Sequence, residues 1–136
     1  MKLPTQAEFD AEMKRLLDRA TNAGLQAARK WSKGNLTYRD MRKEDHPYAA
    51  RHAFALRDPT MINTHRGVFL AAWKTTPAKG SAFAMQATIE NASPFADLLD
   101  KGTRFMHKRP VRTRVEKAVE DYLMKYTAAA VRRAFA

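Results

Sequence analysis

The chain of 136 residues contains no cysteine, which excludes disulfide bonds, zinc–thiolate centres and a thiol nucleophile. Glycine is also scarce, and none of the five glycines belongs to a glycine-rich phosphate-binding loop. No apolar run approaches the roughly 18 residues that a membrane-spanning helix needs. The amino terminus becomes charged before a signal-peptide core develops, so we predict a soluble protein made in a cytoplasm, with no membrane partner.

Acidic residues are few relative to basic ones. The chain has 25 Lys and Arg against 14 Asp and Glu, a formal net charge of +11. Such an excess is typical of proteins that contact nucleic acid. The hydrophobic fraction of 45% is that of an ordinary globular protein, and the length predicts a single domain over residues 1–136.

Two long helices are predicted at the ends of the chain. Residues 1–35 carry an amphipathic stripe that begins after Thr5 and Glu8, whose spacing is that of a capping box. Gly34 is the expected stop, and Gly24 is expected to weaken or bend the helix. Pro110 is expected to open a second helix over residues 110–136. Its predicted buried stripe comprises Val111, Val115, Ala118, Val119, Tyr122, Leu123, Tyr126 and Ala130.

The middle of the chain divides into two parts. Residues 36–62 have no periodicity and are expected to form a long irregular, mostly extended segment. Residues 63–109 are expected to hold short helices and a β-hairpin. One helix would carry Phe69, Leu70 and Trp73.

Alternation predicts the clearest strand of the chain. Phe83, Met85, Ala87 and Ile89 share one apolar face, and Pro77 with Lys79–Gly80 would form the hairpin turn before it. Ser93 and Pro94 then predict the start of another short helix. That helix is expected to bury Phe95, Leu98 and Leu99 and to end at Gly102.

These elements predict an α+β fold, in which a small antiparallel sheet packs with the two long helices. Two strands are too few for a stable isolated sheet. A further strand is therefore expected either from residues 36–62 or from a neighbouring subunit.

One block resembles a known family. It consists of Asn91, Phe95–Ala96, the run Leu99–Asp100–Lys101–Gly102–Thr103, Met106, and Arg109–Pro110. In order and spacing it is similar to the neck and minor-tail proteins of tailed bacteriophages, the tail-completion or head–tail joining proteins. Upstream, Gly67–Val68–Phe69 and Ala72–Trp73 are also similar to the family. The resemblance covers about residues 61–136 and departs from the family at Arg66 and in the long segment 36–62.

The resemblance implies a structural protein of the virion. Such a protein would form a hexameric or dodecameric ring at the head–tail junction. Its partners would be copies of itself, head-closure proteins, and the tail terminator or tail tube, with DNA passing through the channel. It implies no catalytic residue, no cofactor and no metal.

Candidate interface residues follow from the charge pattern. Five cations without an intervening carboxylate surround the predicted start of the last helix, and unlike surfaces must match in a cyclic ring. They are Arg104, Lys108, Arg109, Arg112 and Arg114, and Tyr48 and Arg51 of the irregular segment are added to them. The residues expected to shape the motif are Gly67, Trp73, Asn91, Phe95, Gly102, Thr103 and Pro110.

A basic, sequence-independent DNA-binding or other interaction module is the alternative. Residues 101–136 carry a net +7 and residues 29–43 a net +5, which together suit phosphate contacts. Against it, no helix-turn-helix, zinc-finger or aromatic RNA-binding motif is present.

An enzyme is the least favoured interpretation. The serines lie in no nucleophile elbow, and Asp97 and Asp100 are better explained by the helix dipole and the surface. The four histidines, at positions 46, 52, 65 and 107, have no metal-binding spacing. Trp31, Trp73, Tyr122 and Tyr126 are predicted to pack in the core instead of stacking on bases.

Overall fold

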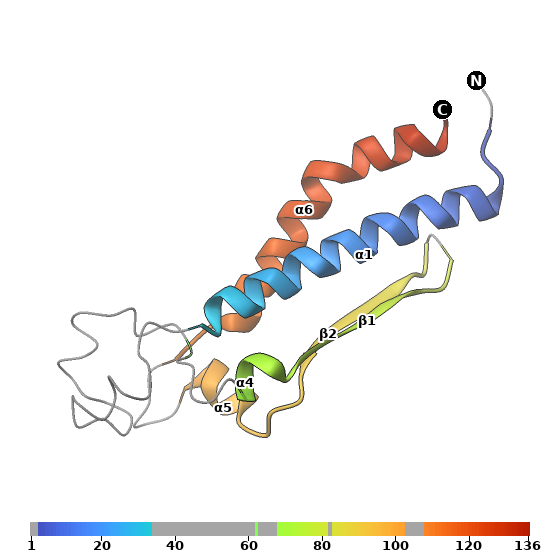
Figure 1. Cartoon of the computed structure of the whole chain (residues 1–136). Coiled ribbons are helices and arrows are strands. Elements are labelled where there is room, and N and C mark those ends of the chain that lie inside the picture. The colour runs from blue at the N-terminus through green and yellow to red at the C-terminus, as the bar shows by residue number, and fades with distance from the viewer. Residues whose placement is uncertain (1–2, 34–61, 63–67, 82, 103–107) are drawn as a thin grey trace, which may run out of the picture.

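The computed structural model describes residues 3–33, 62, 68–81, 83–102 and 108–136. The elements run in the order α1 (Gln6–Trp31), α4 (Val68–Ala71), β1 (Trp73–Lys79), β2 (Gln86–Asn91), α5 (Ala96–Lys101) and α6 (Val111–Ala134). The two long helices lie side by side, and the hairpin β1–β2 runs along α1 (Figure 1). The predicted α+β class is confirmed. The predicted irregular segment 36–62 lies, apart from Ile62, outside the described residues.

Helix α1 begins as its sequence predicts. The Thr5 hydroxyl oxygen accepts a hydrogen bond from the Glu8 backbone N–H at 3.2 Å, and the same hydroxyl donates to the Glu8 carboxylate. This satisfies one of the free amides at the helix start. The helix ends at Trp31, with Ser32 as its C-cap.

Gly24 is a point of close packing within an unbroken helix. A Cβ built on it would lie 2.6 Å from Ile89 Cδ1 and 2.7 Å from Val119 Cγ2. Only a glycine therefore allows β2 and α6 to approach α1 this closely. The predicted weak point in the helix is the place where α1, β2 and α6 meet.

A backbone N–H at the start of helix α6 is capped by a side chain of another element. Pro110 is the N-cap residue and supplies no side-chain bond, but Asp100 Oδ1 of α5 accepts from the Arg112 backbone N–H at 2.9 Å. A carboxylate at a helix N-terminus is also favoured by the helix dipole. The predicted stripe is largely confirmed, with Val111, Val115 and Ala130 buried, but Tyr126 is 37% exposed.

The hairpin differs from the prediction at its start and around its turn, where Lys79 lies in β1 and Met85 lies before β2. Trp73 begins β1 instead of lying in the preceding helix, and Pro77 lies inside β1 instead of in the turn. Phe83 lies in the turn and is 88% exposed, because β2 begins only at Gln86. From Gln86 onward the predicted alternation is confirmed, with Ala87 and Ile89 partly buried.

The strands pair antiparallel, from Trp73 opposite Asn91 to Lys79 opposite Gln86, with an irregularity between Thr76 and Lys79. Asp18 of α1 fixes this irregular part. Its Oδ1 accepts from the backbone N–H of Ala78 at 2.8 Å, and its Oδ2 receives Lys14 Nζ at 2.8 Å. The hairpin is thus bound to the helix as well as packed on it.

Helix α5 buries less than predicted. Leu99 packs on the core and Gly102 ends the helix with φ +74°, as expected. Phe95 and Leu98, however, are 63% and 51% exposed. A helix of six residues offers one narrow buried stripe, and Leu99 occupies it.

The core lies where α1 ends and α6 begins. Ala28, Ile62, Val111 and Val115 form its buried centre. The partly buried hydrophobic side chains packed around them are Trp31, Phe69, Trp73, Ile89 and Leu99. The predicted core role of both tryptophans is confirmed.

Candidate protein-binding groove

The structure separates the predicted interface cations. Lys108 and Arg112 are exposed, Arg114 is half-buried and Arg109 is buried. Arg104, Tyr48 and Arg51 lie outside the described residues, as do Gly67 and Thr103 of the motif and all four histidines.

Arg109 is a correction to the predicted interface. It is only 5% exposed, and its backbone N–H donates to the Leu99 carbonyl of α5 at 3.0 Å. Burial lowers the pKa of its guanidinium from the ordinary value. Its Nε has no hydrogen-bond partner among the described residues. This side chain therefore offers no surface to a partner.

Arg112 and Arg114 have partners within the chain. Arg112 Nε lies 3.1 Å from Glu116 Oε1, one helical turn away. The Arg114 guanidinium carbon lies 3.4 Å from the centre of the Trp31 ring, a cation–π contact that joins α6 to α1. Arg114 thus serves first to hold the two long helices together.

The described motif residues mainly shape the fold. Trp73 Nε1 donates to Ser32 Oγ at 2.9 Å, and Ser32 Oγ in turn donates to the Ala28 carbonyl. The Asn91 amide donates to the Phe69 carbonyl at 3.0 Å and accepts from the Ser93 backbone N–H at 2.8 Å. Asn91 therefore closes β2 and directs the chain toward α5.

A groove of about 590 Å³ lies between α1, β2, α5 and α6. Its volume falls within the roughly 300–1,000 Å³ of cavities that receive ligand-sized groups. Sequence reasoning did not predict it. Its apolar lining includes Leu17, Ile62, Phe69, Ile89, Val115 and Val119, and we call the whole the acidic groove after its charged lining.

The charge of the acidic groove opposes that of the chain. Among the described residues, five carboxylates and one guanidinium line it, a net −4 in a chain of +11. The charged residues other than these six are 24 basic and nine acidic, a net +15. The charged lining residues are Glu90, Asp97, Asp100, Glu116, Glu120 and Arg112.

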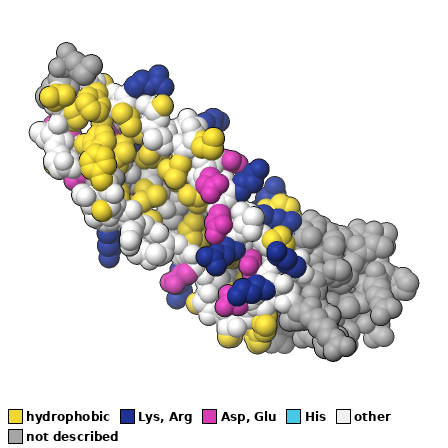
Figure 2. Space-filling view, turned by 180° about the vertical axis from the view of Figure 1, so that it is seen from behind, with side chains coloured by type: hydrophobic (Ala, Val, Ile, Leu, Met, Phe, Trp, Pro, Cys, Tyr) yellow, Lys and Arg dark blue, Asp and Glu magenta, His cyan; other side chains and the backbone are white. Residues whose placement is uncertain are grey.

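The other end of the molecule carries aromatic side chains. Phe9 of α1 lies 6.0 Å from the Phe83 ring and 6.3 Å from the Phe135 ring. Figure 2 shows hydrophobic side chains gathered toward this end, whereas acidic and basic side chains share the surface nearer the other end.

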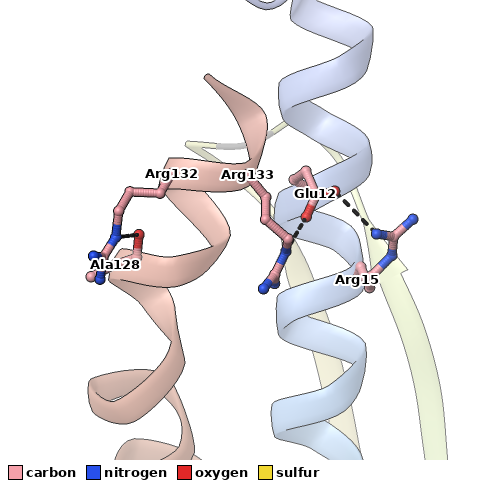
Figure 3. A network of polar contacts seen from close by, with 5 residues as sticks. All are labelled: Glu12, Arg15, Ala128, Arg132 and Arg133. Atoms are coloured by element: carbon pink, nitrogen blue, oxygen red, sulfur yellow. Dashed lines mark hydrogen bonds and ion pairs between the residues drawn. The ribbon is translucent and has the colours of Figure 1, made fainter. Parts of the chain in front are cut away.

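Polar contacts hold the helices together at the aromatic end. The Glu12 carboxylate forms two ion pairs (Figure 3). One is with Arg15 of the same helix at 3.0 Å, and the other is with Arg133 of α6 at 3.4 Å. Arg132 instead turns to the Ala128 carbonyl of its own helix. Both Arg132 and Arg133, near the end of α6, therefore make contacts within the chain.

The residues considered for catalysis have other surroundings. Ser32 is buried and bonded to Trp73, and Ser93 accepts from the Phe95 backbone N–H. In the described ranges, no three His, Cys, Asp or Glu side chains are grouped so as to hold a metal ion. Nor does any helix of those ranges have the length and apolar character needed to cross a membrane.

Comparisons with protein-family models, with curated proteins and with solved structures gave no match.

Proposed function

We propose that the chain is a structural subunit that assembles with copies of itself into a ring at the head–tail junction of a tailed bacteriophage. In the virion it would join head-closure proteins to the tail. The resemblance of residues 61–136 to the neck and tail-completion proteins is the reason for naming this setting.

The observation that carries the proposal is the acidic groove on a strongly basic chain. Exposed cations lie outside it at the end of α1, where Arg29, Lys30 and Lys33 follow one another closely, at Lys101 in α5, and at Lys108 before α6. One molecule thus presents an apolar, acidic concavity and separate basic surfaces. Two unlike, complementary surfaces are what a head-to-tail contact requires, and such contacts form a ring when the rotation between neighbours closes.

The test is the mass of the purified full chain without DNA, measured by light scattering, together with negative-stain images. We expect a closed ring of identical subunits. A chain that stays monomeric alone and in the presence of tailless phage heads would contradict the proposal.

Duplex DNA provides the discriminating measurement. A ring protein that only surrounds DNA needs little affinity for it. Tight duplex binding by a monomer, falling steeply as salt is added, would instead support the basic DNA-binding module.

A further inference from the structure

We propose that the acidic groove receives the outer face of α5 from a second copy of this chain. The outer face of α5 is defined by Phe95, Leu98 and Lys101. This inference rests on the proposed ring and names the surfaces that would build it.

Helix α5 has two opposite sides. Ala96, Asp97 and Asp100 line the groove of their own chain. Leu98 and Lys101 are three positions apart and therefore share another side of the helix, and Phe95, three positions before Leu98, is the N-cap residue. Because neither Phe95 nor Leu98 lines the groove, they remain 63% and 51% exposed.

The outer face of α5 matches the groove in chemistry. Two large apolar side chains would cover the apolar lining formed by Phe69, Ile89 and Val119. The ammonium of Lys101 would then meet the carboxylates of the lining. Glu90 and Glu120 are the best placed to answer it, since both are exposed and neither has a bond within the described chain.

Asp97 is likewise exposed and has no bond within the described residues, but the two remaining groove carboxylates have partners already. Asp100 accepts the Arg112 backbone N–H, and Glu116 pairs with the Arg112 side chain. Apolar contact would supply most of the affinity, and the charges would fix register and exclude wrong pairings.

The position of α5 makes the contact directional. One side of the helix lines the acidic groove of its own chain, and the opposite side is the outer face that would enter the groove of a neighbour. Each copy can then accept one neighbour and enter another, which is a heterologous contact. A two-fold dimer would use the same patch on both copies, so no surface would remain to bind a third copy.

The experiment uses two variants that each disable one surface. Glu120→Lys places a cation in the groove and leaves the outer face of α5 intact. Leu98→Asp places a carboxylate on the outer face and leaves the groove lining intact. Since a like charge or a buried unpaired charge at an interface costs several kcal/mol, each variant alone should self-associate more than about tenfold more weakly than the wild type.

Mixing the two variants is the decisive step. The Glu120→Lys chain can still enter the groove of the Leu98→Asp chain, and assembly must stop after that one contact. Sedimentation should therefore show a heterodimer in the mixture and monomers in each variant alone. Matched controls are Asp121→Lys and Met124→Asp, because both positions are exposed on α6 and lie outside the groove. Both controls should assemble like the wild type.

A cross-link gives an independent readout, because the chain has no cysteine of its own. A Glu90→Cys chain mixed with a Lys101→Cys chain should form a mixed disulfide, and an Asp121→Cys chain mixed with the same partner should not.

The outcomes separate the two proposals. A wild-type ring that persists in both variants, or a mixture that yields only monomers, would overturn the groove contact and leave the ring standing. A wild type that never self-associates would overturn the ring as well.

Discussion

Asp18 shows how one side chain joins two elements. Burial acts to raise the pKa of Asp18, but its hydrogen bonds from Lys14 and from the Ala78 amide, with the nearby Lys14 charge, prevail and lower the pKa below the ordinary 3.8. The folded state therefore binds this proton less readily than the unfolded chain. The stabilisation is fully present above pH 4 and is lost as pH falls through the lowered pKa.

We expect Asp18→Ala to destabilise the fold by about 1–3 kcal/mol, because the amide of buried Ala78 loses its acceptor. Asp18→Asn keeps an oxygen for that amide and should cost less. It should also flatten the loss of stability below pH 4, since the titrating group is gone. Urea unfolding followed by circular dichroism at pH 3 and pH 7 measures both effects. An equal acid sensitivity in Asp18→Asn and the wild type would contradict this account.

Other residues show what sequence can and cannot predict. The Thr5 cap and the Gly102 stop depend on neighbours within a few positions, so both were predictable. Arg109 was predicted as an exposed interface cation because its sequence neighbourhood is basic. It is buried, and its backbone N–H bonds to Leu99, ten positions away, which no local pattern indicates.

At the scale of elements, the crossing at Gly24 holds the architecture together. The helices α1 and α6 and the strand β2 meet there without room for a methyl group. Glycine is a poor helix former, so Ala at this position would favour an isolated helix by about 1 kcal/mol. The same methyl would force Ile89 or Val119 to move, and overpacking of this kind costs about 1–3 kcal/mol.

We therefore expect Gly24→Ala to lower the free energy of unfolding by about 1 kcal/mol, despite the gain in helix propensity. Asn22→Ala is the matched control, because Asn22 is exposed on the same helix and carries no packing constraint. It should be neutral or slightly stabilising. Thermal unfolding of the two variants, compared under identical conditions, measures the difference. A more stable Gly24→Ala protein would show that the three elements can separate without cost.

Periodicity and capping predicted both long helices and the second strand. The failures lie where one element gives way to the next. Trp73 is apolar at a spacing that suits either a short helix or a strand, and its bond to Ser32, 41 positions away, decides for the strand. Phe95 and Leu98 have a helical spacing typical of a buried face. Burial of that face requires another element to pack on it, and the sequence spacing does not show whether one does.

At the scale of the whole molecule, charge is divided between surfaces. The acidic groove escaped prediction because its carboxylates come from β2, α5 and α6 and are scattered over more than thirty positions of the sequence. The sequence shows the net charge of +11, but it does not show that the groove formed in the fold is negatively charged. The excess first suggested nucleic acid, and the acidic groove adds a surface on the same chain that complements it.

This division predicts a specific dependence on salt. Raising the ionic strength from about 0.1 M to about 1 M shortens the screening length from about 10 Å to about 3 Å. Attraction between the groove carboxylates and Lys101 should weaken, so the assembled mass should fall but not collapse, since the apolar contact remains. Lys101→Ala should lower the assembled mass already at low salt. Adding salt should then lower the mass of this variant much less than that of the wild type. Light scattering across a salt series compares the two proteins. A wild-type mass that does not change with salt would show that the charges contribute nothing to assembly.

The pairing of α1 with α6 has a further consequence for how the protein is made. The first long element of the chain buries its face against the last, and the Phe9–Phe135 and Glu12–Arg133 contacts join positions separated by more than 120 residues. The contact order is therefore high for so helical a chain, and such topologies fold slowly. During synthesis α1 leaves the ribosome long before α6 exists, so its apolar stripe stays uncovered until α6 has been made. The native fold can be completed only after α6 has emerged, and until then a chaperone or a copy of the same nascent chain can compete for that stripe.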